Sequence, residues 1–159
     1  MQSSDFQNYF NKIPSLSNHF KGTFPIDLLP NKITLKTFFI VNLDPSTMTG
    51  SHWVAFIKVK PQTCEIFDSL GFSNKLNLIK PHLNFKEKLD FIYNKTPFQS
   101  KESILCGKFC IMFLVERMLN QTMYFTDLLS EIFSTDLIKN DKIVTDFCEN
   151  ILNGSSFYL

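Results

Sequence analysis

The chain has 159 residues, of which 44% are hydrophobic and 19% charged, and it contains 18 phenylalanines. This composition is typical of a single packed domain spanning residues 1–159 and excludes a largely disordered chain. Sixteen basic and fifteen acidic side chains leave a formal net charge of +1, so there is no global field that would attract nucleic acid or a membrane.

No segment has the layout of a signal peptide, and no apolar run approaches the ~20 residues needed to cross a bilayer. We therefore expect a soluble intracellular protein with no membrane partner. The four cysteines are too few and too irregularly spaced for the disulfide framework of a secreted domain; they are Cys64, Cys106, Cys110 and Cys148. In a reducing compartment, a cysteine is a structural hydrophobe, a metal ligand or a nucleophile.

The first two thirds of the chain predict a short helix, a loop and a small sheet. The helix is expected at residues 3–12, and the run Phe20–Pro30, interrupted by Gly22 and Pro25, is expected to be an ordered loop with buried anchors. Four segments rich in β-branched and aromatic residues predict strands of a mostly antiparallel sheet: Thr34–Asn42, His52–Lys60, Thr63–Ser69 and, more weakly, Leu89–Tyr93.

The last third predicts helices. Residues 104–120 are apolar on every side until Glu116 and Arg117, which is typical of a helix buried in the core. Two amphipathic helices are expected to follow, at 124–139 and 141–153. The predicted fold class is therefore α+β, with a central buried helix packed on the sheet and further helices at the C-terminus.

Catalysis by a thiol requires a nucleophile, a base, a group that orients the base and donors for an oxyanion. His52 begins one predicted strand and Asp68 ends the next. If the hairpin pairs Val59 with Thr63, His52 becomes the diagonal neighbour of Asp68 on one face, ~7–8 Å away at the backbone. A slip of one residue would send Asp68 to the other face.

The predicted central helix supplies the nucleophile. Ser103 is expected to cap it, which would put Cys106 in the first turn, where free N–H groups favour a thiolate and can bind an oxyanion. Gly107 leaves room for a substrate backbone. Gln99 lies in a preceding turn, where its amide could donate to the same oxyanion. Cys110, one turn later, is expected to be an inert core residue.

Each candidate also has an ordinary structural explanation when taken alone. His52 could stack on Trp53 at a sheet edge, Asp68 could form a turn, and Gln99 could lie on the surface. A zinc site using Cys106, Cys110 and His52 lacks the second pair of cysteines that such sites usually have. A non-catalytic binding module with the same residues also stays open.

Several stretches resemble the adenain family, which comprises the adenovirus maturation protease and its relatives in Polinton-type mobile elements. GSHWVAF (50–56), CEIFDSLG (64–71), the Gln99 loop and LCGKFCIMFL (105–114) resemble its His-Trp, acidic, Gln and Cys-Gly blocks. FKGTFPIDLLP and NLDPSTMTGSHW resemble its N-terminal block. The SUMO-deconjugating proteases share this order of blocks, so a deconjugase for a ubiquitin-like modifier is the closest alternative.

The resemblance implies a papain-like cysteine protease architecture in which His52, Asp68 and Cys106 form a catalytic triad. It also implies an oxyanion hole made by Gln99 and Cys106, with Trp53 packed beside the histidine. The substrate groove is expected to be bordered by Trp53 together with Gly50, Ser51 and Gly107. The family has a glutamate at the position of Asp68. The SUMO-deconjugating proteases have an aspartate there, as this chain does.

The resemblance further implies the partners. The substrates would be structural precursor proteins of a virus or mobile element, cut near small residues and often after glycine. The enzyme would act in the host nucleus or cytoplasm and could be packaged in the particle. No cofactor is required by the sequence, although the family implies an activating peptide or DNA; the net charge of +1 makes DNA binding weak or absent.

Overall fold

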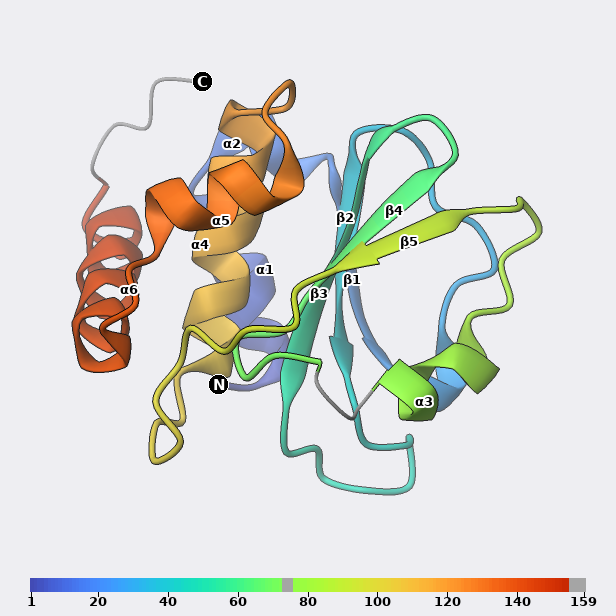
Figure 1. Ribbon diagram of the computed structural model, residues 1–159, viewed down its shortest axis with the longest axis horizontal. Helices are drawn as coiled ribbons and strands as arrows, with labels where there is room; N and C mark the ends of the chain where they lie inside the picture. Colours follow the sequence, from blue (N-terminus) through green and yellow to red (C-terminus); the bar gives the residue numbers. More distant parts are fainter. Residues whose placement is uncertain (73–75, 155–159) are drawn as a thin grey trace.

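Figure 1 shows the computed structural model, which describes residues 1–72 and 76–154. Within these residues the chain forms a five-stranded sheet and six α-helices, which confirms the α+β class. The strands are β1 (Phe20–Pro25), β2 (Thr37–Asn42), β3 (Trp53–Lys60), β4 (Thr63–Phe67) and β5 (Asp90–Tyr93). The helices are α1 (Ser3–Asn11), α2 (Pro14–Ser17), α3 (Leu76–Ile79), α4 (Cys106–Leu119), α5 (Phe125–Ile132) and α6 (Leu137–Leu152), with 3₁₀ turns at Ile26–Leu28 and Lys80–His82.

The strands follow one another in chain order across the sheet, but the prediction of a mostly antiparallel sheet is wrong at both edges. The central pairs β2/β3 and β3/β4 are antiparallel, whereas β1/β2 and β4/β5 are parallel. A parallel neighbour needs a long crossover connection. Residues 26–36 and 68–89 provide these crossovers, and only the β3–β4 turn is short enough for a tight hairpin.

The segment Phe20–Pro30 begins with strand β1, so the expectation of a loop throughout is wrong. Gly22 has φ +107° and lies where the pairing with β2 shifts register, as expected for a glycine in a bulge. Pro25 is the last residue of the strand. Both residues are tolerated because β1 is an edge strand, where some backbone groups need no ladder partner.

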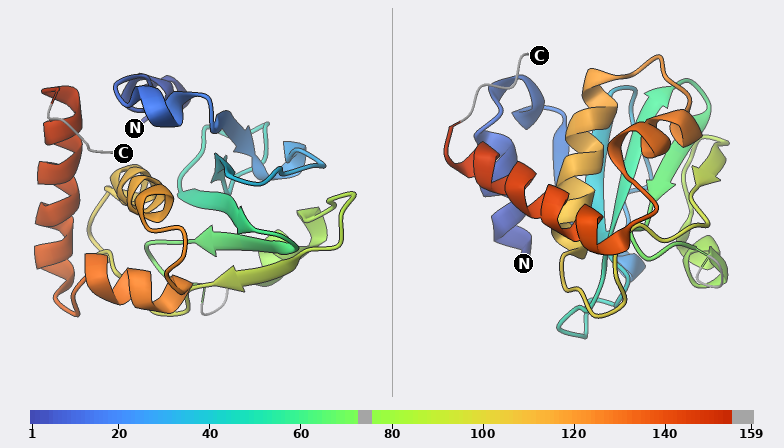
Figure 2. Two further views of the ribbon diagram at one scale, coloured as in Figure 1. Left: turned by 90° about the horizontal axis from the view of Figure 1, so that it is seen from above. Right: turned by 60° about the vertical axis from the view of Figure 1, so that its left-hand side comes forward.

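Both faces of the sheet are covered. On one face, Phe38 and Ile40 of β2 join a core that includes α1 and α4, while on the other Phe39 and Val41 join a second core. Figure 2 shows α4 between the sheet and α6. Burial on both faces explains why the four central residues of β2, 38–41, are all apolar instead of alternating with polar ones.

The predicted C-terminal helices exist, but their boundaries differ from those expected. The first ends at Ile132, and the second begins at Leu137. The break has a clear cause, because the Asp136 side chain accepts a hydrogen bond from the Lys139 amide at 3.0 Å and caps α6. No helix in the described part of the chain is long and apolar enough to cross a bilayer.

Arg117 of α4 is fully buried and forms a paired contact with Glu65 of β4. Arg117 Nη2 and Nε lie 2.6 and 2.7 Å from the two carboxylate oxygens. Its Nη1 donates to the carbonyls of Asn120 and Met123, both at 2.8 Å. The ion pair of Arg117 with Glu65 therefore links the end of α4 to the sheet.

We expect Arg117→Met to lower the free energy of unfolding by about 3–5 kcal/mol, because it leaves Glu65 as a buried charge without its cation. Urea denaturation measures this loss. The double variant Arg117→Met/Glu65→Leu is the matched control and should recover part of it, since both charges are then absent. A single variant as stable as the parent would contradict this role for the ion pair.

Candidate active site

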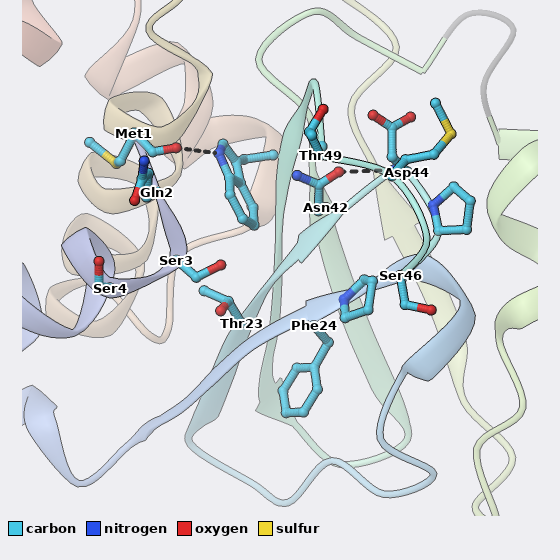
Figure 3. Close-up of a pocket in the computed structure, with 15 residues that line it drawn as sticks. Met1, Gln2, Ser3, Ser4, Thr23, Phe24, Asn42, Asp44, Ser46 and Thr49 are labelled. Carbon is cyan, nitrogen blue, oxygen red and sulfur yellow. Dashed lines mark hydrogen bonds between the residues drawn. The ribbon is translucent and has the colours of Figure 1, made fainter.

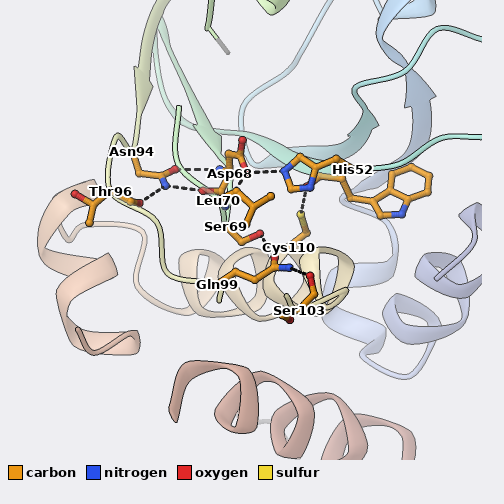
Figure 4. A network of polar contacts seen from close by, with 10 residues as sticks. His52, Asp68, Ser69, Leu70, Asn94, Thr96, Gln99, Ser103 and Cys110 are labelled. Atoms are coloured by element: carbon orange, nitrogen blue, oxygen red, sulfur yellow. Dashed lines mark hydrogen bonds and ion pairs between the residues drawn. The ribbon is translucent and has the colours of Figure 1, made fainter. Parts of the chain in front are cut away.

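His52 and Asp68 meet at one end of the central strands (Figure 4). His52 directly precedes β3 and Asp68 directly follows β4. His52 Nε2 lies 2.6 Å from Asp68 Oδ1. The pairing of Ala55 with Phe67, continued by one residue, puts Val54 opposite Asp68, which is the predicted register. The turn differs from the prediction, because Lys60, and not Val59, pairs with Thr63.

Asp68 is held from several directions. Its side chain is completely buried, and Oδ1 also accepts a hydrogen bond from the Leu70 amide at 2.8 Å. Asn94 binds its backbone twice, because Asn94 Oδ1 accepts from the Asp68 amide at 3.0 Å and Asn94 Nδ2 donates to the Asp68 carbonyl at 2.6 Å. The carboxylate therefore has little freedom to turn away from the imidazole.

Cys106 is the first residue of α4, and the expectation that Ser103 caps this helix is wrong. Leu105 occupies the N-cap position. The Ser103 hydroxyl instead accepts a hydrogen bond from the Leu105 amide at 3.2 Å. The helix thus starts two residues later than expected, so Cys106 is its first residue instead of its third. Its N–H still has no partner inside the helix and is available as a donor.

The Cys106 thiol is hydrogen-bonded to the His52 imidazole. Since Nε2 faces Asp68, Nδ1 is the nitrogen left for the sulfur. Burial alone lowers the pKa of His52, but its hydrogen bonds and charge interactions with Asp68 and Cys106 outweigh burial and raise that pKa to about 9. Burial raises the pKa of Cys106, but the contacts with His52 and with the Trp53 backbone outweigh it and lower that pKa.

The raised pKa of His52 and the lowered pKa of Cys106 favour a thiolate–imidazolium pair. The pH dependence of alkylation tests this pair. A free thiol with a pKa near 8.5 loses about 50-fold in reactivity between pH 8.5 and 6.5, because its thiolate fraction falls from about one half to about 1%. The reactivity of Cys106 should fall by clearly less than that of the free thiol, because the pKa of Cys106 is lowered and the pKa of His52, about 9, keeps a cation beside the sulfur.

Iodoacetamide kinetics at a series of pH values, with N-acetylcysteine as the matched control, measure this difference. Burial raises the pKa values of the other three cysteines, so they contribute little to the signal; they are Cys64, Cys110 and Cys148. A fall of about 50-fold for the protein thiol between pH 8.5 and 6.5, as for a free thiol, would contradict the ion pair.

Gln99 is buried and not the surface residue that the alternative explanation requires. Its side-chain oxygen accepts a hydrogen bond from Ser69 Oγ at 2.6 Å, and its Nε2 donates to the Ser103 carbonyl at 2.6 Å. One N–H of the amide is thereby used, and the second N–H of the same group is the one available to an oxyanion. Ser69 follows Asp68 directly, so the amide is positioned from the same loop as the carboxylate.

For the acyl-transfer chemistry that the sequence predicts, we expect Gln99→Ala to lower kcat by ~10²–10³, as for the loss of one oxyanion donor. Ser69→Ala is the matched control because it removes the hydrogen bond that orients the amide and keeps the amide itself. It should lower kcat less than Gln99→Ala does. If Gln99→Ala changed only KM, the residue would be a binding residue and not an oxyanion donor.

The residues expected to border one substrate groove line two separate pockets or neither of them. Trp53 and Gly50 line a pocket of about 740 Å³, whereas Gly107 lines a second pocket of about 410 Å³. A Cβ on Gly50 would meet the Asn42 side chain at 2.1 Å, and Gly50 has φ +85°, so glycine is required there. Ser51 is exposed and does not line either pocket.

Sequence reasoning did not identify Asn94, although it holds Asp68. Asn94 directly follows β5, and β5 runs parallel to β4, with Tyr93 opposite Ile66. Parallel strands end at the same edge of a sheet, so a parallel pairing would have brought Asn94 next to Asp68. The signal existed, but the antiparallel expectation concealed it.

The described residues, 1–72 and 76–154, contain no group of three or more His, Cys, Asp or Glu side chains placed to hold a metal. No family model matches the chain, and no curated protein matches it in sequence.

Proposed function

We propose that the chain is a cysteine peptidase with the papain-like architecture of the adenain type. The observation that carries the proposal is the contact of His52 with both Asp68 and Cys106 at the start of a buried helix. A thiol, an imidazole and a carboxylate in this order are what nucleophilic acyl transfer needs. The resemblance of the surrounding sequence blocks agrees with this chemistry.

In the proposed reaction, the Cys106 thiolate attacks the carbonyl carbon of the scissile peptide bond. The oxyanion that forms accepts hydrogen bonds from the Cys106 amide and from Gln99. The His52 imidazolium gives its proton to the departing amine, and the C–N bond breaks to leave a thioester. His52, now neutral, takes a proton from water, whose oxygen attacks the thioester and releases the acid and the thiolate. Asp68 orients the imidazole and stabilises its charged form throughout.

The substrates we propose are structural precursor proteins, cut near small residues and often after glycine. An activating peptide is part of the proposal, and DNA is expected to have little effect. A mixed peptide library, incubated with the protein and with Cys106→Ala, tests the activity. Cleavage that requires Cys106 supports a peptidase, whereas no cleavage with or without added DNA and activating peptide contradicts it.

Two further measurements separate the alternatives. A ubiquitin-like protein carrying a C-terminal fluorogenic group reports a deconjugase, so faster release from it than from any library peptide would favour that function. A thiol-reactive probe at neutral pH reports a competent nucleophile. A protein that neither cleaves nor takes the probe is the non-catalytic binding module.

A further inference from the structure

The residues before α1 lie between the two pockets that flank the candidate site. The carbonyl oxygen of Met1 accepts a hydrogen bond from Trp53 Nε1 at 3.3 Å, and Figure 3 shows this contact at the edge of the larger pocket. The Met1 side chain lies against Gly107, because a Cβ on that glycine would come within 2.6 Å of the Met1 sulfur. Met1 therefore borders both pockets and fills the space expected for a substrate backbone.

The position of Met1 is determined by the helix that follows it. Phe6 of α1 is fully buried, and its ring meets the Trp53 ring edge-on, with centroids 5.0 Å apart. The Gln2 amide donates to the Asp5 carboxylate at 2.6 Å, and the Asp5 amide donates to the Gln2 carbonyl at 3.0 Å. Gln2 has an extended backbone, with φ −102° and ψ 166°. The backbone at Gln2, which leads to Met1, thus has the conformation of an extended peptide.

The reacting groups are poorly accessible in this arrangement. Cys106 and His52 are each only 8% exposed. A scissile carbonyl has to come within about 3–3.5 Å of the sulfur, so part of the site must open first. Met1 is 42% exposed, its polar contact is a single long hydrogen bond, and its side chain is unbranched and flexible. Met1 is therefore held weakly enough to be displaced.

We propose that Met1 and Gln2 are a built-in ligand that occupies one subsite of the groove until an incoming peptide displaces them. This inference rests on the proposed function only in naming a peptide as the displacing ligand. The subsite takes a backbone carbonyl at Trp53 Nε1 and a narrow, unbranched apolar side chain at Gly107. Because α1 tethers the segment, it competes at a high effective concentration and reduces the fraction of open sites.

Trp53 is the only tryptophan in the chain, so its fluorescence reports this contact directly. Met1→Gly, produced behind a removable leader, should shift the emission and raise the rate of Cys106 alkylation by at least about threefold. Gly107→Ala should displace the Met1 side chain from the other side and shift the emission in the same direction. Ile138→Ala removes an exposed apolar side chain of α6 that lines neither pocket, and should keep the parent emission and rate.

Parent-like emission and alkylation in both Met1→Gly and Gly107→Ala would overturn the inference. Peptide cleavage is scored separately. If emission and alkylation change as expected but no peptide is cut, the built-in ligand stands and the peptidase proposal fails. If peptides are cut but neither signal changes, the peptidase stands and the built-in ligand fails.

Discussion

Cys106→Ala should abolish peptide cleavage, with a loss of roughly 10⁴–10⁶ in kcat, because it removes the sulfur that is proposed to form the thioester. Cys110→Ala should retain cleavage and lower the free energy of unfolding by about 0.5–3 kcal/mol. The two cysteines lie one helical turn apart, so the pair tests position and not residue type. Turnover of the library peptides and chemical denaturation measure the two effects.

The difference follows from what surrounds each sulfur. The Cys106 thiol is hydrogen-bonded to His52. Cys110 is completely buried, and its Sγ lies 3.5 Å from the Trp53 carbonyl oxygen. Burial, with the nearby charges of Cys106 and Asp68, raises the pKa of Cys110 well above its ordinary value. Mass spectrometry of protein labelled by a mechanism-based probe should find the adduct on Cys106. An adduct on Cys110 would overturn the site.

His52→Ala should lower kcat by a similar factor of roughly 10⁴–10⁶, because the variant loses both the proton acceptor and the cation that keeps the thiol ionised. Iodoacetamide should then react with Cys106 as with an ordinary thiol, faster as the pH approaches 8.5. If folded His52→Ala cleaved peptides at near the parent rate, His52 would not be the base.

His52→Ala should also lower the free energy of unfolding. Although His52 lies at the start of a strand, it is buried and hydrogen-bonded to the fully buried Asp68. Losing the imidazole leaves a buried carboxylate without its main donor, which costs about 1–3 kcal/mol or more. His52→Ala/Asp68→Asn is the matched control, because it removes the charge as well. It should be more stable than His52→Ala and equally inactive.

The central strands of the sheet and the contact of His52 with Asp68 could be predicted from the sequence. Strands β2, β3 and β4 are dense in β-branched and aromatic residues, and the tight β3–β4 turn restricts their pairing to a few registers. Local pattern and tertiary structure agree in this region. Asp68 therefore falls on the predicted face.

The rest depends on contacts between segments far apart in the chain. The direction of β1 and β5 is decided by their crossovers, which have no local signature. The start of α4 depends on how residues 100–105 pack against neighbouring segments. The Ser100 hydroxyl, for example, donates a hydrogen bond to the Asp141 carboxylate of α6 at 2.5 Å. No pattern in the sequence predicts that Met1 lies against Gly107, because this contact joins the two ends of a long stretch of chain.

The pairing of β3 with β4 is irregular near the turn, so a change in the turn need not alter the pairing that brings His52 to Asp68. Ile57 pairs with Glu65, and Lys60 pairs with Thr63, so β3 has one extra residue between these two pairs. A bulge of this kind absorbs a change of length locally. Natural variants of this protein should therefore tolerate the insertion or loss of one residue within 58–62. They should show no such change within 52–57 or 64–68, where a single residue would turn Asp68 away from His52.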